Sequence, residues 1–250
     1  MLAIYKKELK SYFITPVGYV YIGIFLALSA LIFCYTTLMS RTYETANYFS
    51  MLIMSFVVLI PLLTMKLFSE EKKLRTEQML LTAPVTVTGM VMGKYLAALT
   101  MFVGSLLASC INFIPLYSVA MQERAEAGES AAIKHIGPAG AEIIGSLIGV
   151  ILIGAAFVAV GMLISTLTEN QLAAAVISVA VLLLMLLLSI VNNFIPNYAI
   201  RFIIDWFCVL SRFLPFGYGR FDFSALLYYI SITAVFIFLT IRVYEKRRWG

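Results

Sequence analysis

The chain has few charged residues and few of the side chains that carry catalysis or bind metals. Charged residues make up 12% of its 250 residues, and a single histidine, His135, is present. The three cysteines, Cys34, Cys110 and Cys208, lie far apart and form no C-x-x-C pair, which argues against a metal site or a disulfide framework. No nucleophile with a neighbouring base stands out, so the sequence predicts a non-enzymatic chain with no cofactor or metal of its own.

Long apolar runs dominate instead. Apolar residues make up 62% of the chain, against roughly 45–50% in soluble domains. A hydrocarbon core of about 30 Å needs about 20 apolar residues per crossing, which predicts a polytopic membrane protein with no room for a separate soluble domain. Six spans are expected, at residues 17–39, 48–67, 88–121, 139–167, 171–191 and 223–243.

The third and fourth runs are longer than one crossing needs. Tilted helices that project past the bilayer would explain the extra length, and so would breaks near Pro115 and Gly154. The sequence leaves both alternatives open.

The net charge of +5 does not indicate nucleic-acid binding, because the basic residues are scattered near span ends, where anionic lipid headgroups explain them better. With six spans, twelve of the eighteen basic residues fall on the side of both termini and six on the other. The positive-inside rule therefore places both termini in the cytoplasm. A multi-pass protein of a prokaryotic cytoplasmic (inner) membrane is expected.

Residues 1–13 have the pattern of a helix lying in the membrane interface. Leu2 and Leu9 share one helical face, whereas Lys6 and Lys10 lie on the other. The residue before a proline avoids the helical region, so Thr15, which precedes Pro16, predicts an elbow before the first span.

Small residues recur at four-residue spacing in two spans. Gly89 and Gly93 precede Lys94 in a string that resembles a phosphate-binding loop but lacks its spacing. The better interpretation is a face that lets the helix approach a neighbour closely, as Gly145 and Gly149 do in the fourth span.

An external segment, residues 192–222, mixes aromatic and aliphatic side chains with charges. Arg201 and Asp205 have opposite charge at i,i+4 spacing, so a helical hairpin could enter the outer leaflet with its charges paired. Two interpretations stay open: an external gate or substrate exit formed by Arg201, Asp205 and Arg212, or an interfacial helix anchored by aromatic residues.

The most informative segment is polar and lies between the second and third spans, at residues 68–85. Ser69 is expected to cap a helix whose first turn holds Glu70 and Glu71, and Pro84 offers a stop. The apolar run that ends at Leu81 would be exposed on a solvated connector, which favours a docking helix for a partner.

This segment, with the elbow and six spans, resembles the permease subunits of ABC-2 type ABC transporters. The resemblance covers the whole chain in layout and is specific over residues 68–94. The positions that match the family pattern are Glu70, Glu71, Thr76, Leu80, Thr82, Pro84, Gly93 and Lys94. Arg75 stands where glycine is usual, and Gln78 stands where glutamate is usual. The first twenty residues look more particularly like the gliding-motility-associated branch.

The resemblance implies an all-α integral membrane fold with six transmembrane helices, an N-terminal elbow helix, a cytoplasmic coupling helix and an outer-leaflet re-entrant hairpin before span 6. It also implies an exporter in which two permeases, identical or related, dock a separate ABC ATPase that binds ATP and Mg. Membrane lipids and an extracytoplasmic accessory subunit are further expected partners, and nucleic acid is not. The expected ATPase-docking residues are Glu70, Glu71, Arg75, Thr76, Gln78, Leu80, Leu81, Thr82 and Pro84. The alternative is a membrane anchor or scaffold that recruits a non-ATPase partner through the same segment.

Overall fold

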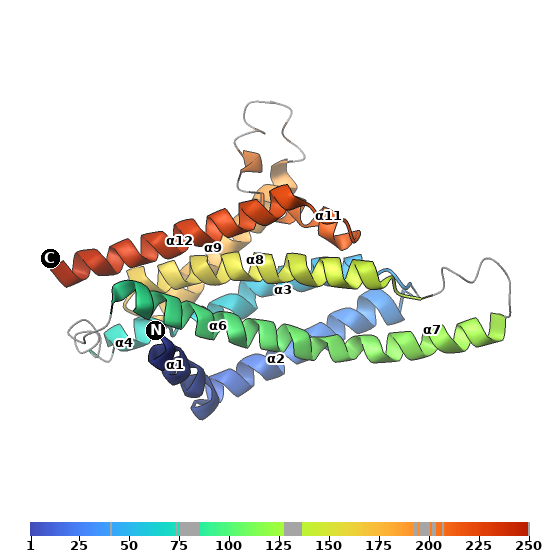
Figure 1. The fold of residues 1–250 in the computed structure, drawn as a ribbon, viewed down its shortest axis with the longest axis horizontal. Helices are drawn as coiled ribbons and strands as arrows, with labels where there is room; N and C mark the ends of the chain where they lie inside the picture. Colours follow the sequence, from blue (N-terminus) through green and yellow to red (C-terminus); the bar gives the residue numbers. More distant parts are fainter. Residues whose placement is uncertain are drawn as a thin grey trace.

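The fold is a bundle of long helices with their axes roughly aligned (Figure 1). The computed structural model describes residues 1–40, 42–73, 75, 86–127, 137–192, 195, 201, 204–206 and 208–249, and this part of the chain contains no β-strand. Its elements are α1 (Leu2–Ile14), α2 (Pro16–Phe33), η1 (Cys34–Leu38), α3 (Ala46–Thr64), α4 (Ser69–Lys73), α6 (Val87–Ser109), η2 (Cys110–Asn112), α7 (Phe113–Ala127), α8 (Gly140–Leu167), α9 (Gln171–Val191), η5 (Leu210–Arg212), α11 (Leu214–Gly217) and α12 (Phe223–Trp249).

Six helices in the described residues are long and apolar enough to cross a membrane, which confirms the expected number of spans. They are Pro16–Leu38, Ala46–Lys73, Val87–Glu123, Gly140–Leu167, Gln171–Val191 and Phe223–Arg248. The fourth of these helices, α8, is the most buried, and α12 is the least buried. Exposed apolar side chains on α2, α9 and α12 are what contact with lipid or with another membrane protein requires.

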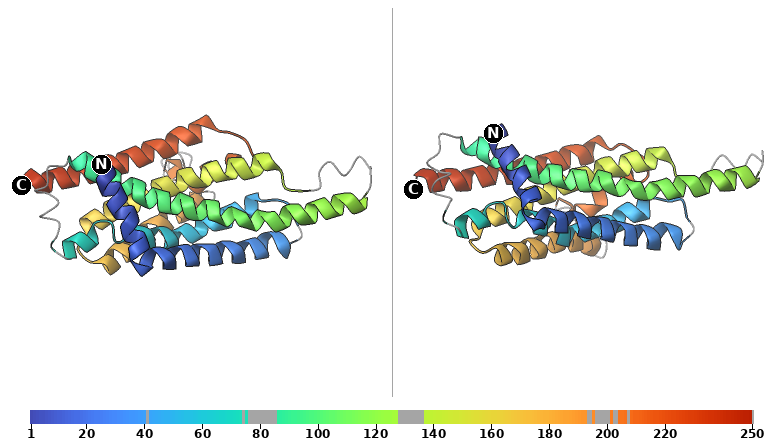
Figure 2. Two further views of the ribbon diagram at one scale, coloured as in Figure 1. Left: turned by 60° about the horizontal axis from the view of Figure 1, so that its bottom comes forward. Right: turned by 90° about the horizontal axis from the view of Figure 1, so that it is seen from below.

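One end of the bundle carries both chain termini together with α1 and α4, and we call it the terminal end (Figure 1). Here α1 lies across the direction of the spans, as the two further views show (Figure 2). The chain turns from α1 into α2 at Thr15, whose extended backbone (φ −84°, ψ 146°) is the conformation favoured before Pro16. The turn is tight, because a Cβ atom on Gly18 would lie 2.2 Å from the carbonyl oxygen of Tyr12.

The inner face of α1 is fixed by Tyr12, which is buried and donates a hydrogen bond of 3.1 Å to the carbonyl oxygen of Leu63 at the end of α3. Burial raises the pKa of this phenol well above its usual range, so it stays a neutral donor at all physiological pH values.

The third and fourth apolar runs, which are longer than one crossing needs, differ in whether their helices break. The third breaks from α-helix into a 3₁₀ turn at Cys110–Asn112, just before Pro115, which has no N–H to offer the preceding turn. The helix then resumes as α7, which extends past the other helices at the far end (Figures 1 and 2). The fourth run, α8, continues through Gly154 without a break. Gly154 instead makes room for the ring of Phe102 on α6, which an added Cβ would approach to 2.1 Å.

Close approach at the two predicted small-residue faces involves neighbours that are not spans. A Cβ on Gly93 would lie 3.1 Å from the carbonyl oxygen of Met1, so α6 packs against α1 there. On α8, Gly145 and Gly149 face Phe216 and Phe213 of the external segment. The predicted small-residue faces therefore do permit close packing, but the segments that pack against them are α1 and α11 and not other spans.

Candidate functional site

The candidate site lies at the terminal end, around a lysine in the second turn of α6. This helix begins after Thr86, whose hydroxyl oxygen accepts a hydrogen bond from the amide of Gly89 at 3.2 Å. Two turns are enough to carry Lys94 inside the bundle, where its side chain is 1% exposed. A charged group at this depth is costly unless it is paired.

Three oxygen atoms surround the ammonium group of Lys94. Its Nζ lies 2.9 Å from Oε1 of Glu8 on α1, 2.9 Å from Oε1 of Glu71 on α4, and 2.7 Å from the carbonyl oxygen of Leu67. A lysine ammonium has three N–H donors, so each donor has an acceptor. The ring of Phe68 covers the group at 5.0 Å from Nζ to the ring centroid.

A second lysine balances the charge of this site. Nζ of Lys7 lies 3.7 Å from Glu71 and 3.9 Å from Glu8 at the exposed edge. Two carboxylates and two ammonium groups then share one site, which we call the Lys94 cluster. The cluster joins three segments that are distant in sequence: α1, α4 and the start of α6.

A second set of contacts fixes α4 to α8. The hydroxyl oxygen of Ser165 accepts hydrogen bonds from the backbone amides of Phe68 (3.1 Å) and Ser69 (3.2 Å). Lys72 donates from Nζ to the carbonyl oxygens of Thr166 and Thr168, near the C-terminus of α8. Cations are favourable there, because the last carbonyl groups of a helix have no partner within it.

The C-terminal end of α12 joins the same site. Arg247 donates from Nη2 to the carbonyl oxygen of Thr166 at 3.0 Å. The ring of Tyr244 packs on Phe68 with centroids 4.7 Å apart, and the guanidinium group of Arg247 lies 5.8 Å from the Tyr244 ring. The short helix α4 is therefore tied to α1, α6 and α8, and Phe68, the residue directly before it, packs against α12.

The structure places the predicted docking residues in different environments. Glu71 points inward to Lys94, and its side chain is 14% exposed. Glu70 lines a small cavity beside Glu8 and Lys66, between α1 and the end of α3. Arg75 is exposed. The other predicted contacts, Thr76, Gln78, Leu80, Leu81, Thr82 and Pro84, lie outside the described residues.

Ser69 does not cap α4 as the sequence suggests. It is buried, its amide bonds to Ser165, and its hydroxyl donates to the carbonyl oxygen of Met65 one turn earlier. The reason is continuity, because turns at residues 65–68 lead from α3 into α4 and leave no free helix start to cap.

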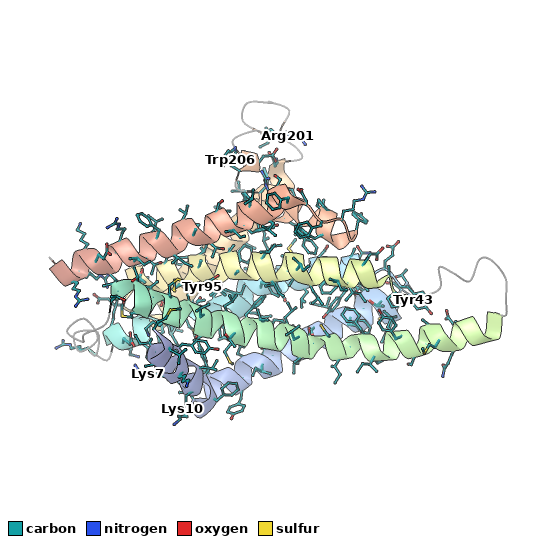
Figure 3. The ribbon with its side chains drawn as sticks, in the orientation of Figure 1. Lys7, Lys10, Tyr43, Tyr95, Arg201 and Trp206 are labelled. Carbon is teal, nitrogen blue, oxygen red and sulfur yellow. The ribbon has the colours of Figure 1, made fainter. Side chains whose placement is uncertain are left out.

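The expected external pair between Arg201 and Asp205 is wrong: among the described residues, no ion pair joins them. Asp205 instead accepts a hydrogen bond from Nδ2 of Asn192, directly after α9. Arg212 lies over the ring of Tyr228 on α12, 4.4 Å from its centroid. Arg201 is exposed on the flank of the bundle beside α12 (Figure 3), so the three predicted gate residues have three separate environments.

Sequence reasoning missed the parts of this site that carry its geometry. Lys94 appears in the sequence only as part of a glycine–lysine step, and Glu8 and Ser165 are not singled out. The available signal is that Lys94 is the only charged residue between 88 and 121. A lone charge in an apolar span demands a partner, although it does not name one.

No known protein family matches the chain, and no curated protein matches it.

Proposed function

We propose that this chain is the permease subunit of an ABC-2 type ABC transporter. It works as a dimer in the cytoplasmic membrane and docks a separate ATPase through the segment that follows α4. The observation that carries this proposal is the attachment of α4 to three helices at once, to α1 and α6 through the Lys94 cluster and to α8 through the contacts of Ser165 and Lys72.

The attachment supports a mechanical role. A partner that pulls on residues 74–85 displaces α4, since the two are contiguous in the chain. Because α4 is bonded to α1 and α6 on one side and to α8 on the other, it can move only if these helices move or its bonds break. Rigid-body motion of packed helices is a common way to switch a protein between states.

The conformation of Arg75 also supports the resemblance. Its φ is +56°, in the left-handed region that favours glycine, and its amide donates to the carbonyl oxygen of Lys72 at 3.0 Å. The family pattern has glycine at this position. A helix end that needs a positive φ gives a physical reason for that glycine, and here arginine adopts the same conformation.

The direct test is recovery of an ATPase with the tagged chain from its own membranes in mild detergent. The variant carries Leu80→Asp and Leu81→Asp, which remove the apolar anchor expected to enter the partner. The matched control is Glu169→Gln, an exposed residue at the same end of the bundle but outside the polar segment.

We expect the parent chain and the control to recover an ABC-type ATPase and to raise its rate of ATP hydrolysis. The double variant should lose both effects while it still elutes as a single folded species. Undiminished ATPase recovery by the double variant would refute docking through this segment. Recovery of a partner without ATPase activity would assign the chain to the scaffold alternative.

A further inference from the structure

An apolar groove lies beside α1, on the surface of the bundle and apart from the Lys94 cluster. Its volume is about 380 Å³, and its walls come from α1 (Leu9 and Phe13), α2 (Ile22) and α6 (Thr100 to Ala108). From Thr100 to Ala108 the lining extends about 12 Å along the axis of α6. The groove therefore runs from the level of α1 into the region of the spans.

The walls offer almost no polar atom to an occupant. The hydroxyl groups of Thr100 and Ser105 donate back to carbonyl oxygens of α6 itself, at 2.7 and 2.9 Å. Tyr5 closes one edge, with its hydroxyl oxygen 3.1 Å from that of Thr100. Gly104 leaves the middle of the groove open, since a Cβ built on it would meet nothing within 4 Å. Such a lining suits a hydrocarbon chain.

Positive charges lie on α1, the helix that forms one wall of the groove. Lys6 is three residues before Leu9 and seven before Phe13, so it lies where the polar face of α1 borders the apolar face, and Lys10 follows one turn later on the polar face. Both lysines are exposed, and neither forms an ion pair with a described residue. Figure 3 shows Lys10 on the side of α1 that faces away from the other helices.

We propose that the groove binds one anionic phospholipid from the leaflet at the terminal end. An acyl chain fills the groove between α1 and α6, and the headgroup phosphate lies at Lys6 and Lys10. Charge complementarity favours this occupant, because a long lysine side chain can lie along an apolar surface and still place its ammonium group at headgroup level. The site does not depend on an ATPase, so it stands or falls separately from the proposed function.

The test is native mass spectrometry of the full chain, solubilised in mild detergent and titrated with phosphatidylglycerol or phosphatidylcholine of the same acyl chains. Gly104→Leu fills the groove. Gly23→Leu is the matched control, because Gly23 is also an exposed glycine within a helix whose added Cβ meets nothing within 4 Å, and it lies outside the groove lining. Both changes favour the helix, so loss of folding is not expected.

We expect the parent chain and Gly23→Leu to retain one phosphatidylglycerol in preference to phosphatidylcholine, and Gly104→Leu to lose it. Lys6→Gln and Lys10→Gln should each weaken binding about fivefold, whereas Lys10→Arg keeps the charge and the affinity. Equal retention of the two lipids, or unchanged retention by Gly104→Leu, overturns the proposal. Loss of the dimer with Gly104→Leu and no change in bound lipid would overturn the proposal and assign the groove to a second copy of the chain.

Discussion

Replacement of Lys94 by methionine should destabilise the protein more than any other single charge change at the terminal end. The substitution keeps the length of the side chain but removes the ammonium group that Glu8 and Glu71 each contact at 2.9 Å. Two carboxylates then lose their shared counter-charge, and Lys7, at 3.9 Å from Glu8 and 3.7 Å from Glu71, is a more distant and more exposed substitute. Loss of one partner from a buried ion pair costs about 3–5 kcal/mol.

The assay is the apparent melting temperature in detergent, followed by the monodisperse fraction after heating. A cost of 3–5 kcal/mol corresponds to a fall of about 6–20 °C for a chain of this size. The control is Lys73→Met, an exposed lysine on the same short helix. Surface substitutions usually stay within about 0.5 kcal/mol, so the control should shift by no more than about 2 °C.

A compensating variant separates unpaired charge from lost packing. If Lys94→Met is combined with Glu8→Gln and Glu71→Gln, the buried charges are removed together and only the exposed Lys7 loses its partners, so most of the stability should return. Equal shifts for Lys94→Met and Lys73→Met would refute the reasoning. So would a combined variant that is as unstable as Lys94→Met alone.

Three further predictions concern packing, hydrogen bonding and thiol reactivity. Gly154→Ala should cost about 1–3 kcal/mol, because its Cβ would overlap the ring of Phe102, while Gly23→Ala should be neutral to slightly stabilising; equal melting temperatures would contradict this packing. Ser165→Ala leaves two buried amides at the start of α4 without an acceptor and should cost about 1–3 kcal/mol, with faster hydrogen exchange at those amides by mass spectrometry; unchanged exchange would argue against the contact. Burial raises the pKa of the Cys208 thiol, so labelling by maleimide at neutral pH should be slow in the folded protein, should speed up as the pH rises toward that pKa, and should be fast after denaturation; equal labelling before and after denaturation would refute its burial.

The spans could be predicted from the sequence because hydrocarbon thickness sets their length and composition. The break before Pro115 and the elbow before Pro16 also have local causes, since proline acts on its immediate neighbours. Gly154 shows the limit of this reasoning. A glycine in a long apolar run is compatible with a break or with a close contact, and the choice depends on Phe102, 52 residues away.

The candidate site was predictable only in its location. The polar residues after α3 indicate a special segment, but their spacing does not reveal that Glu71 turns inward to Lys94. Residue spacing misled at Arg201 and Asp205, because Asn192 holds the carboxylate of Asp205 from a position thirteen residues earlier. Charge pairs between distant segments depend on the packing of whole helices, which no local pattern encodes.

The Lys94 cluster constrains the order in which the chain can assemble during synthesis. Glu8 and Lys94 are 86 residues apart, so α1 and the first two spans are made before the ammonium group that holds them together exists. Until the third span is inserted, the carboxylates of Glu8 and Glu71 lack the ammonium group of Lys94 and remain best solvated at the membrane surface. The N-terminal helix can therefore bond to the end of α3 through Tyr12 early, but its Glu8 side is fixed only when the third span delivers Lys94.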